Sequence, residues 1–248
     1  MIKPMQPFSI LLGLGAIAGL LLVSWRAPKK EPVRYLDAGL VVMFGALFGG
    51  RAVTVAVNWG YYQTHISEIY QVWLGGISGV GALAGGILAV IIVARLGNFQ
   101  TGNLADTLLP LAGTLTIAAW MGCWMDSCGY GLASNVWWAL PGRDEWGMLA
   151  PRVPIQLIGA LLTLGMFWLL ERASKRLPHS GIAASVGLLG LAVELFSLSF
   201  FRADPMPVWL GLRLEAWGAL GLGLLAILAL VVLFKHWMKE RERKKPAI

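Results

Sequence analysis

Charged residues are scarce in this chain: aspartate, glutamate, lysine and arginine make up 13% of its 248 residues. An ordinary soluble domain carries about 25%, because a surface that faces water needs those charges. The scarcity therefore excludes a water-soluble globular protein, and the 57% hydrophobic content excludes a disordered chain. The same composition excludes a nucleic-acid-binding protein, so we expect no nucleic-acid partner.

Cysteine and histidine are also rare. Cys123 and Cys128 are the only two cysteines, and the three histidines, His65, His179 and His236, lie in different parts of the sequence. Two cysteines are too few for a small disulfide scaffold, and the scattered histidines lack the spacing of a zinc site. We therefore expect no metal and no other cofactor. The cysteine pair is expected as free thiols or as one disulfide.

What the chain has instead is long apolar runs. A helix that crosses the hydrocarbon core needs about 20 mostly apolar residues, and its backbone amides must be paired within the segment. We predict an all-α polytopic membrane protein, with a single membrane domain over residues 1–248. The seven predicted transmembrane helices are Phe8–Trp25, Asp37–Val57, Gln71–Ala94, Leu104–Gly122, Arg152–Glu171, Gly181–Phe200 and Glu215–Lys235.

The longest connector runs from Cys123 to Pro151 and contains Trp137, Trp138 and Trp146. Tryptophan favours the headgroup zone of a bilayer. We therefore expect this connector to lie on the membrane surface and not to form a soluble domain.

Lysines and arginines are unevenly divided between the two sides of the membrane. When the connectors are numbered alternately, five cations fall on the side of the N-terminus and fourteen on the other. By the positive-inside rule, the N-terminus is predicted outside and the C-terminus in the cytoplasm. The fourteen are Arg26, Lys29, Lys30, Arg34, Arg95, Arg172, Lys175, Arg176, Lys235, Lys239, Arg241, Arg243, Lys244 and Lys245.

The third predicted helix contains a glycine-rich run. Nine of the twelve residues from Gly75 to Gly86 are Gly, Ala or Ser. Small residues four apart, such as Gly81 and Gly85, let helices approach closely in lipid. A broken helix is the alternative, because exposed amides and missing side chains admit a lipid headgroup. On that interpretation the lipid-binding candidates are Gly76, Ser78, Gly79 and Gly81.

Two ionisable residues, Arg51 and Glu194, lie inside predicted transmembrane helices. An ionised side chain in lipid is costly, so each should face the bundle interior and meet a partner. For Arg51 two interpretations stay open. It either completes an internal network of ion pairs or backbone carbonyls, or it binds a phosphate, which its planar guanidinium suits.

Several short segments of the sequence match the motifs of a known protein family, in the same order along the chain. Residues 73–86, WLGGISGVGALAGG, are similar to W-x-G-G-x-S-F-H-G-G, and residues 122–131, GCWMDSCGYG, to the later part of a G-R-x-G-C-F-x-N-G-C-C-Y-G signature. The other matches are residues 49–51, GGR, with G-G-R; 152–157, RVPIQL, with R-H-P-S-Q-L; and 200–204, FFRAD, with F-F-R-x-x-D. Together they make the chain resemble the bacterial prolipoprotein diacylglyceryl transferase family from about residue 37 onward.

The resemblance implies a function and a location. Members of that family transfer a diacylglyceryl group from phosphatidylglycerol to the lipobox cysteine of a prolipoprotein, at the bacterial inner membrane. A phosphatidylglycerol-like phospholipid and a lipoprotein precursor are the implied partners, with Arg51 and Arg202 as phosphate ligands. The substrate thiol must lose its proton. Asp126 is the catalytic candidate for that step, although carboxylates are weak bases for a thiol of pKa about 8.5.

The ionisable groups that the family is thought to use are missing from this chain. Val80 stands at the position of the family histidine, and Trp120 at that of the signature arginine. Gly159 replaces a glutamate of the fifth helix, and Leu195 and Ser199 stand where an arginine and a glutamate precede F-F-R. The glycines of the family are retained where the reactive groups are not.

Two functions therefore compete. The first is an active phosphatidylglycerol–prolipoprotein diacylglyceryl transferase with rearranged chemistry. The second is a catalytically silent paralogue that serves as a lipid-binding or accessory subunit of a membrane assembly. A transporter is a weaker third option, because such folds pair broken helices in two repeated halves and the sequence has one glycine-rich segment.

Overall fold

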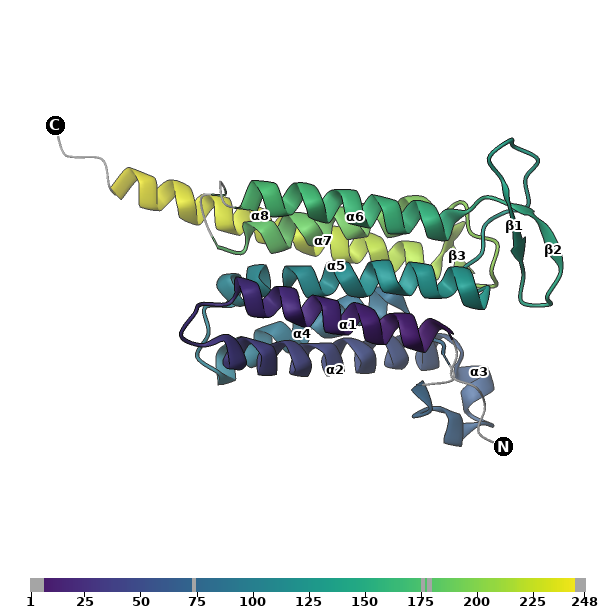
Figure 1. The fold of residues 1–248 in the computed structure, drawn as a ribbon, viewed down its shortest axis with the longest axis horizontal. Coiled ribbons are helices and arrows are strands. Elements are labelled where there is room, and N and C mark those ends of the chain that lie inside the picture. Colours follow the sequence, from purple (N-terminus) through teal and green to yellow (C-terminus); the bar gives the residue numbers. More distant parts are fainter. Residues whose placement is uncertain (1–6, 73–74, 175–176, 178–179, 244–248) are drawn as a thin grey trace.

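The computed structural model describes residues 7–72, 75–174, 177 and 180–243. Among these residues are seven helices that are long and apolar enough to cross a membrane, and they lie side by side in one bundle (Figure 1). The predicted seven-helix membrane fold is therefore confirmed. The seven are α1 (Pro7–Arg26), α2 (Pro32–Val57), α4 (Gly79–Leu96), α5 (Thr101–Asp126), α6 (Ile155–Ser174), α7 (Ile182–Ser199) and α8 (Leu214–Arg243).

Short elements gather at one end of the bundle, called the hairpin end here (Figure 1). Strands β1 and β2 form an antiparallel hairpin in which Leu140 pairs with Arg152 and Arg143 with Leu149. The long connector thus folds into a hairpin at the ends of the helices; its predicted place on the membrane surface stays a prediction. The short elements are α3 (Trp59–Tyr62), η1 (Ile66–Glu68), β1 (Leu140–Arg143), β2 (Leu149–Arg152), β3 (Val208–Trp209) and β4 (Leu212–Arg213).

The two ends of the bundle differ in character. Helix α1 begins at the hairpin end, whereas α8 extends beyond the other helices at the opposite end (Figure 1). We call that second end the basic end, because Arg26, Arg34, Arg95 and the last turns of α8 lie there. Which end faces the cytoplasm stays a prediction from the count of cations.

Glycines hold α2 and α4 in close contact. A Cβ atom on Gly81 would lie 2.6 Å from the carbonyl oxygen of Gly49, and one on Gly85 would collide with the carbonyl of Gly45. The two helices therefore cross backbone to backbone, which only small residues allow. Helix packing, the simpler interpretation of Gly81 and Gly85, is confirmed.

The third membrane helix starts later than predicted. The expected segment begins at Gln71, but α4 begins at Gly79, because the backbone at Gly75 and Gly76 has φ of 88° and 72°. These values suit glycine and do not continue a right-handed helix. Ser78 then opens α4 as its N-cap, accepting a hydrogen bond from the Gly81 amide at 3.2 Å. The glycine-rich run is thus an irregular segment followed by a tightly packed helix.

Other helix ends differ by less. Helix α2 begins five residues before the predicted Asp37, and α5 continues four residues past the predicted Gly122. Helix α8 reaches Arg243, whereas Lys235 was the predicted end. Apolar content marks only the part of a helix that lies in hydrocarbon, so polar turns that continue it into the headgroup layer are missed.

Candidate functional site

Arg51 lies in the last part of α2 and is 6% exposed. Within the described residues, its guanidinium donates to backbone carbonyls of the segment that leads into α4. Nε donates to Ile69 at 2.8 Å, Nη1 to Gly75 at 2.7 Å and to Gly76 at 3.1 Å, and Nη2 to Glu68. The ring of Tyr62 lies 5.2 Å from its Cζ atom. Arg51 therefore fixes the irregular segment, which corresponds to the carbonyl network considered from the sequence.

These hydrogen bonds occupy most of the N–H donors with which Arg51 could bind a ligand. An arginine side chain has five N–H donors, and four hydrogen bonds to carbonyls are already formed. Its role as a phosphate ligand stays a prediction.

The predicted glycine-rich site divides into residues with different surroundings. The carbonyl of Gly76 accepts from Arg51, and the Ser78 amide donates to the carbonyl of Gly50 at 3.1 Å. Gly81 packs against α2, whereas a Cβ on Gly79 would meet nothing within 4 Å. Of the three candidate glycines, only Gly79 borders open space at its Cα atom.

Helices α5, α6 and α7 enclose a hydrogen-bonded group that the sequence motifs did not reveal. The Trp120 indole Nε1 donates to Glu194 Oε1 at 2.8 Å, and the Thr163 hydroxyl lies 2.9 Å from both oxygens of the same carboxyl group. All three residues are buried, with 7%, 7% and 0% exposure for Trp120, Glu194 and Thr163. Glu194 is therefore satisfied by neutral donors, as a buried polar group requires.

Gly159 makes room for this group. A Cβ atom at Gly159 would lie 2.5 Å from the Trp120 ring, so α6 can pass the indole only because position 159 has no side chain. Trp120 thus stands where the resembled family has an arginine, and Gly159 stands where it has a glutamate. The indole ring fills the space that the missing side chain of Gly159 leaves. We name Trp120, Gly159, Thr163 and Glu194 the central group.

Val80, at the position of the family histidine, packs against the neighbouring helix. A Cβ atom on Gly218 of α8 would lie 2.5 Å from a methyl carbon of Val80. The apolar Val80 side chain therefore packs against the backbone of α8. It offers no donor, acceptor or base at this position.

Arg202 is one member of a closed set of ion pairs at the hairpin end. It donates from Nε and Nη2 to Asp204 at 2.8 and 2.6 Å, and from Nη1 to Glu215 at 2.9 Å. Arg213 contacts the same two carboxylates at 3.2 and 3.0 Å. Each of the four side chains is 15–18% exposed. Two cations and two anions thus form a neutral ring, which we call the ion-pair ring.

Electrostatics keep Arg202 charged within this ring. Burial lowers the pKa of its guanidinium, but hydrogen bonds with Asp204 and the charge of Glu215 outweigh burial and raise the pKa above the ordinary arginine value. Because both carboxylates already neutralise it, Arg202 has no unsatisfied charge for a phosphate. Its role as a phosphate ligand also stays a prediction.

Asp126, the predicted catalytic base, ends α5 and contacts α1. Its Oδ2 accepts a hydrogen bond from the backbone amide of Phe8 at 3.0 Å, in the first turn of α1, where a carboxylate is favoured by the helix dipole. Beside it, Cys123 and Cys128 form a disulfide, so the cysteine pair is bonded, one of the two expected states. Asp126 is therefore placed as a structural contact, and its catalytic role stays untested.

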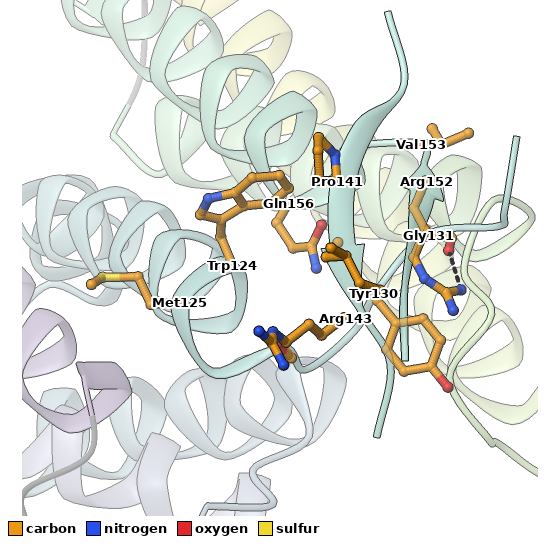
Figure 2. A pocket seen from close by; sticks show the side chains of 12 residues that line it. Trp124, Met125, Tyr130, Gly131, Pro141, Arg143, Arg152, Val153 and Gln156 are labelled. Atoms are coloured by element: carbon orange, nitrogen blue, oxygen red, sulfur yellow. Dashed lines mark hydrogen bonds between the residues drawn. The ribbon is translucent and has the colours of Figure 1, made fainter. Parts of the chain in front are cut away.

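A cavity of about 230 Å³ lies where α5 ends and α6 begins, beneath the hairpin. Figure 2 shows Trp124, Tyr130, Arg143 and Gln156 around it, contributed by α5, the following loop, β1 and α6. Arg152 lines it as well, with its Cζ atom 4.8 Å from the ring of Tyr130 and its Nη2 atom 3.0 Å from Asp144.

The structure thus separates the predicted site residues. The central group, the irregular segment around Arg51 and the ion-pair ring are distinct hydrogen-bonded sets. Arg143 and Arg152 line one cavity, which was not predicted from the sequence. Arg143 lies in β1 and Arg152 in β2, and the pairing of these strands brings both to the cavity. In the sequence, Arg143 lies in the long connector and Arg152 opens the RVPIQL segment, and neither position indicates that they come together. For the ion-pair ring a signal existed: Arg202 and Asp204, and Arg213 and Glu215, repeat an Arg-x-acid pattern.

Comparisons with known proteins agree with this fold. A family model described as prolipoprotein diacylglyceryl transferase matches residues 2–233. A phosphatidylglycerol–prolipoprotein diacylglyceryl transferase of Thermosynechococcus vestitus is 26% identical over 233 residues, covering 85% of this chain and 86% of the relative. The same-named protein of Brucella anthropi is 26% identical over 258 residues, covering 95% and 89%. That of Bacillus licheniformis is 34% identical over 109 residues, covering 42% and 39%.

The seven-helix bundle and these relatives define a multi-pass membrane protein of bacteria. Within that class, the chain belongs to the prolipoprotein diacylglyceryl transferase family.

Proposed function

We propose that this chain binds phospholipid on the family scaffold and does not catalyse diacylglyceryl transfer. The observation that carries the proposal is the central group. Trp120 fills the space beside Gly159 and donates to Glu194, so a neutral indole stands at the position of the signature arginine. Replacing an ion pair by well-packed neutral groups stabilises a buried site, but it removes the charge that a transfer reaction needs.

The chemistry of the transfer makes two demands. The lipobox thiol must lose its proton, since the thiolate is the nucleophile, and the departing glycerol phosphate must be stabilised by positive charge. Val80 supplies no base, and Trp120 supplies no cation. Glu194 is surrounded by donors from Thr163 and Trp120, which stabilise it as a structural acceptor.

Transfer from phosphatidylglycerol to a prolipoprotein is the competing function, because it is what the names of the relatives describe. It would have to use Asp126 as base and Arg51 or Arg202 on the phosphate. The hydrogen bonds already made by these side chains argue against each assignment. For this chain, phosphatidylglycerol and a lipoprotein precursor are therefore proposed as ligands and not as reactants.

The test is a transfer assay with the purified full-length chain. Protein in detergent is incubated with phosphatidylglycerol and a lipobox peptide, and the peptide is examined for a diacylglyceryl thioether by mass spectrometry. The Brucella anthropi relative, treated in parallel, provides the positive control. We expect modified peptide from the relative and none from this chain; modified peptide from this chain would establish transferase activity and reject the proposal.

A matched variant tests whether the central group is the reason. Val80→His, Trp120→Arg and Gly159→Glu together would reintroduce the three residue types of the family. If Val80 and the central group together silence the chain, the folded triple variant forms thioether product above the wild-type background. A folded triple variant without product would assign the silence to another part of the molecule.

A further inference from the structure

The cavity beneath the hairpin carries an unbalanced positive charge. Two of its lining residues are arginines, Arg143 and Arg152, and none is acidic. Arg152 is paired with Asp144 at 3.0 Å. The Arg143 side chain is exposed and forms no hydrogen bond or ion pair with any residue in the described part of the chain. Its charge is therefore available to a ligand.

The remaining arginines of the hairpin end provide the contrast. Arg51 is used by backbone carbonyls, and Arg202 and Arg213 are neutralised within the ion-pair ring. Arg143 is thus the cation at this end whose guanidinium meets no other group of the described residues. A planar guanidinium with free N–H groups suits the oxygens of a phosphate ester.

From the length of α5, we expect the cavity to lie at the level of lipid headgroups. Helix α5 has 26 residues and is about 39 Å long at 1.5 Å per residue, which exceeds the roughly 30 Å of the hydrocarbon core. The last turn of α5, which contributes Trp124 and Met125 to the cavity, therefore reaches the headgroup layer. Met125 and Leu149, both lining residues, are 58% and 64% exposed and give the rim an apolar surface.

Size limits what can enter. At about 230 Å³ the cavity is smaller than the roughly 300–1,000 Å³ of sites that enclose drug-sized ligands. It fits a headgroup fragment and leaves acyl chains outside, against the apolar rim. The Gln156 side chain, 4% exposed, donates to the Cys128 carbonyl at 3.1 Å. This hydrogen bond fixes the backbone between the lining residues Ser127 and Tyr130.

We infer that this cavity is an anion site for a phosphate ester of the glycerophosphate class, with Arg143 as its cation and Trp124 and Tyr130 as its walls. The inference rests on the proposed phospholipid binding and gives it a location. It is separate from the central group, since none of the lining residues belongs to that group. The ester can come from a lipid headgroup or from a soluble glycerol phosphate.

The test measures binding by native mass spectrometry of the full-length chain in detergent. The probes are short-chain phosphatidylglycerol, short-chain phosphatidylcholine, glycerol 3-phosphate and inorganic phosphate. We expect Arg143→Glu to weaken binding of phosphatidylglycerol at least about 10-fold, since hydrogen bonds to a charged group are lost and repulsion is added. Arg143→Lys keeps the charge and loses the planar fork, so it should fall between Arg143→Glu and the wild type.

Arg95→Gln is the matched control, because Arg95 is also exposed but lies at the end of α4, away from the hairpin. It should change the dissociation constant by less than about 2-fold. Tighter binding of phosphatidylglycerol than of glycerol 3-phosphate would identify the lipid headgroup as the source of the ester, and the reverse order a soluble one; both support the site.

Equal binding by wild type and Arg143→Glu would overturn the site while leaving phospholipid binding intact. Absence of binding of all four probes to the wild type would overturn the site together with the proposed lipid binding. Thioether product in the transfer assay would reject the silent function alone, since it does not depend on Arg143.

Discussion

The packed helix interfaces and the loops of the hairpin end hold polar groups in different ways. Between the helices, Glu194 is enclosed by an indole and a hydroxyl, and Val80 packs against the first turns of α8. At the hairpin end, full charges are kept: four of them form the ion-pair ring, and Arg143 stays unpaired within the described residues. Neutral donors thus surround Glu194 between the helices, whereas full charges neutralise one another in the loops.

A shared fold does not by itself establish a shared reaction. Close glycine contacts between α2 and α4 preserve the scaffold, and Arg51 fixes the segment that enters α4. Neither feature depends on Val80, Trp120 or Gly159. The packing of the bundle and the reactive positions can therefore change independently.

The largest effect is expected from Arg51. Arg51→Leu removes the donor from four carbonyl groups in a buried place, so we expect the unfolding free energy to fall by about 3–5 kcal/mol. Equilibrium unfolding in mixed detergent micelles measures it, with Arg95→Gln as control. Unchanged stability of Arg51→Leu would show that the carbonyl contacts contribute nothing, and would reopen a ligand-binding role.

A bulkier residue at position 159 should have the next largest effect. Gly159→Leu places side-chain atoms where the Trp120 ring lies, and such overpacking costs about 1–3 kcal/mol. Trp120→Ala in the same chain should recover part of that loss, giving a negative coupling in a double-mutant cycle. Strictly additive effects would contradict the packed central group.

The ion-pair ring should contribute less. Glu215→Gln leaves Arg202 and Arg213 sharing one carboxylate, and we expect a loss of about 1–2 kcal/mol, since the ring is mostly but not fully buried. The control is Glu31→Gln at the exposed Arg34 pair, which should change stability by less than about 0.5 kcal/mol. An equal loss of unfolding free energy in the two variants would mean that the ion-pair ring contributes no more than an exposed surface ion pair.

The smallest effect concerns an exposed tyrosine beside the Arg51 segment. The Tyr61 hydroxyl donates to the Glu68 carboxylate at 2.9 Å, and this hydrogen bond raises the pKa of Tyr61. Its contribution to stability is present below the ordinary tyrosine pKa and is lost as pH rises through the raised value. Ultraviolet titration, with Tyr61→Phe to identify the signal, should show a lower pKa in Glu68→Gln. An unchanged pKa in that variant would mean that the hydrogen bond does not form.

Hydropathy was sufficient to predict the seven helices, because the bilayer requires their length and composition. It placed the start of α4 at Gln71, since apolar content does not show that Gly75 and Gly76 have positive φ. Family motifs located Trp120 and Gly159 as departures, but not their contact, which depends on how α5 and α6 pass each other. The cavity was unpredictable for the same reason: it is built from β1, β2 and two helix ends that meet only in the fold.

The most direct measurement of the central claim is one native mass spectrum of the wild-type chain after incubation with phosphatidylglycerol and a lipobox peptide. It reports bound lipid and modified peptide together. We predict protein carrying phosphatidylglycerol beside peptide of unchanged mass. Peptide that has gained a diacylglyceryl group would contradict the account, because it would show that the chain catalyses transfer with Val80 and Trp120 in place.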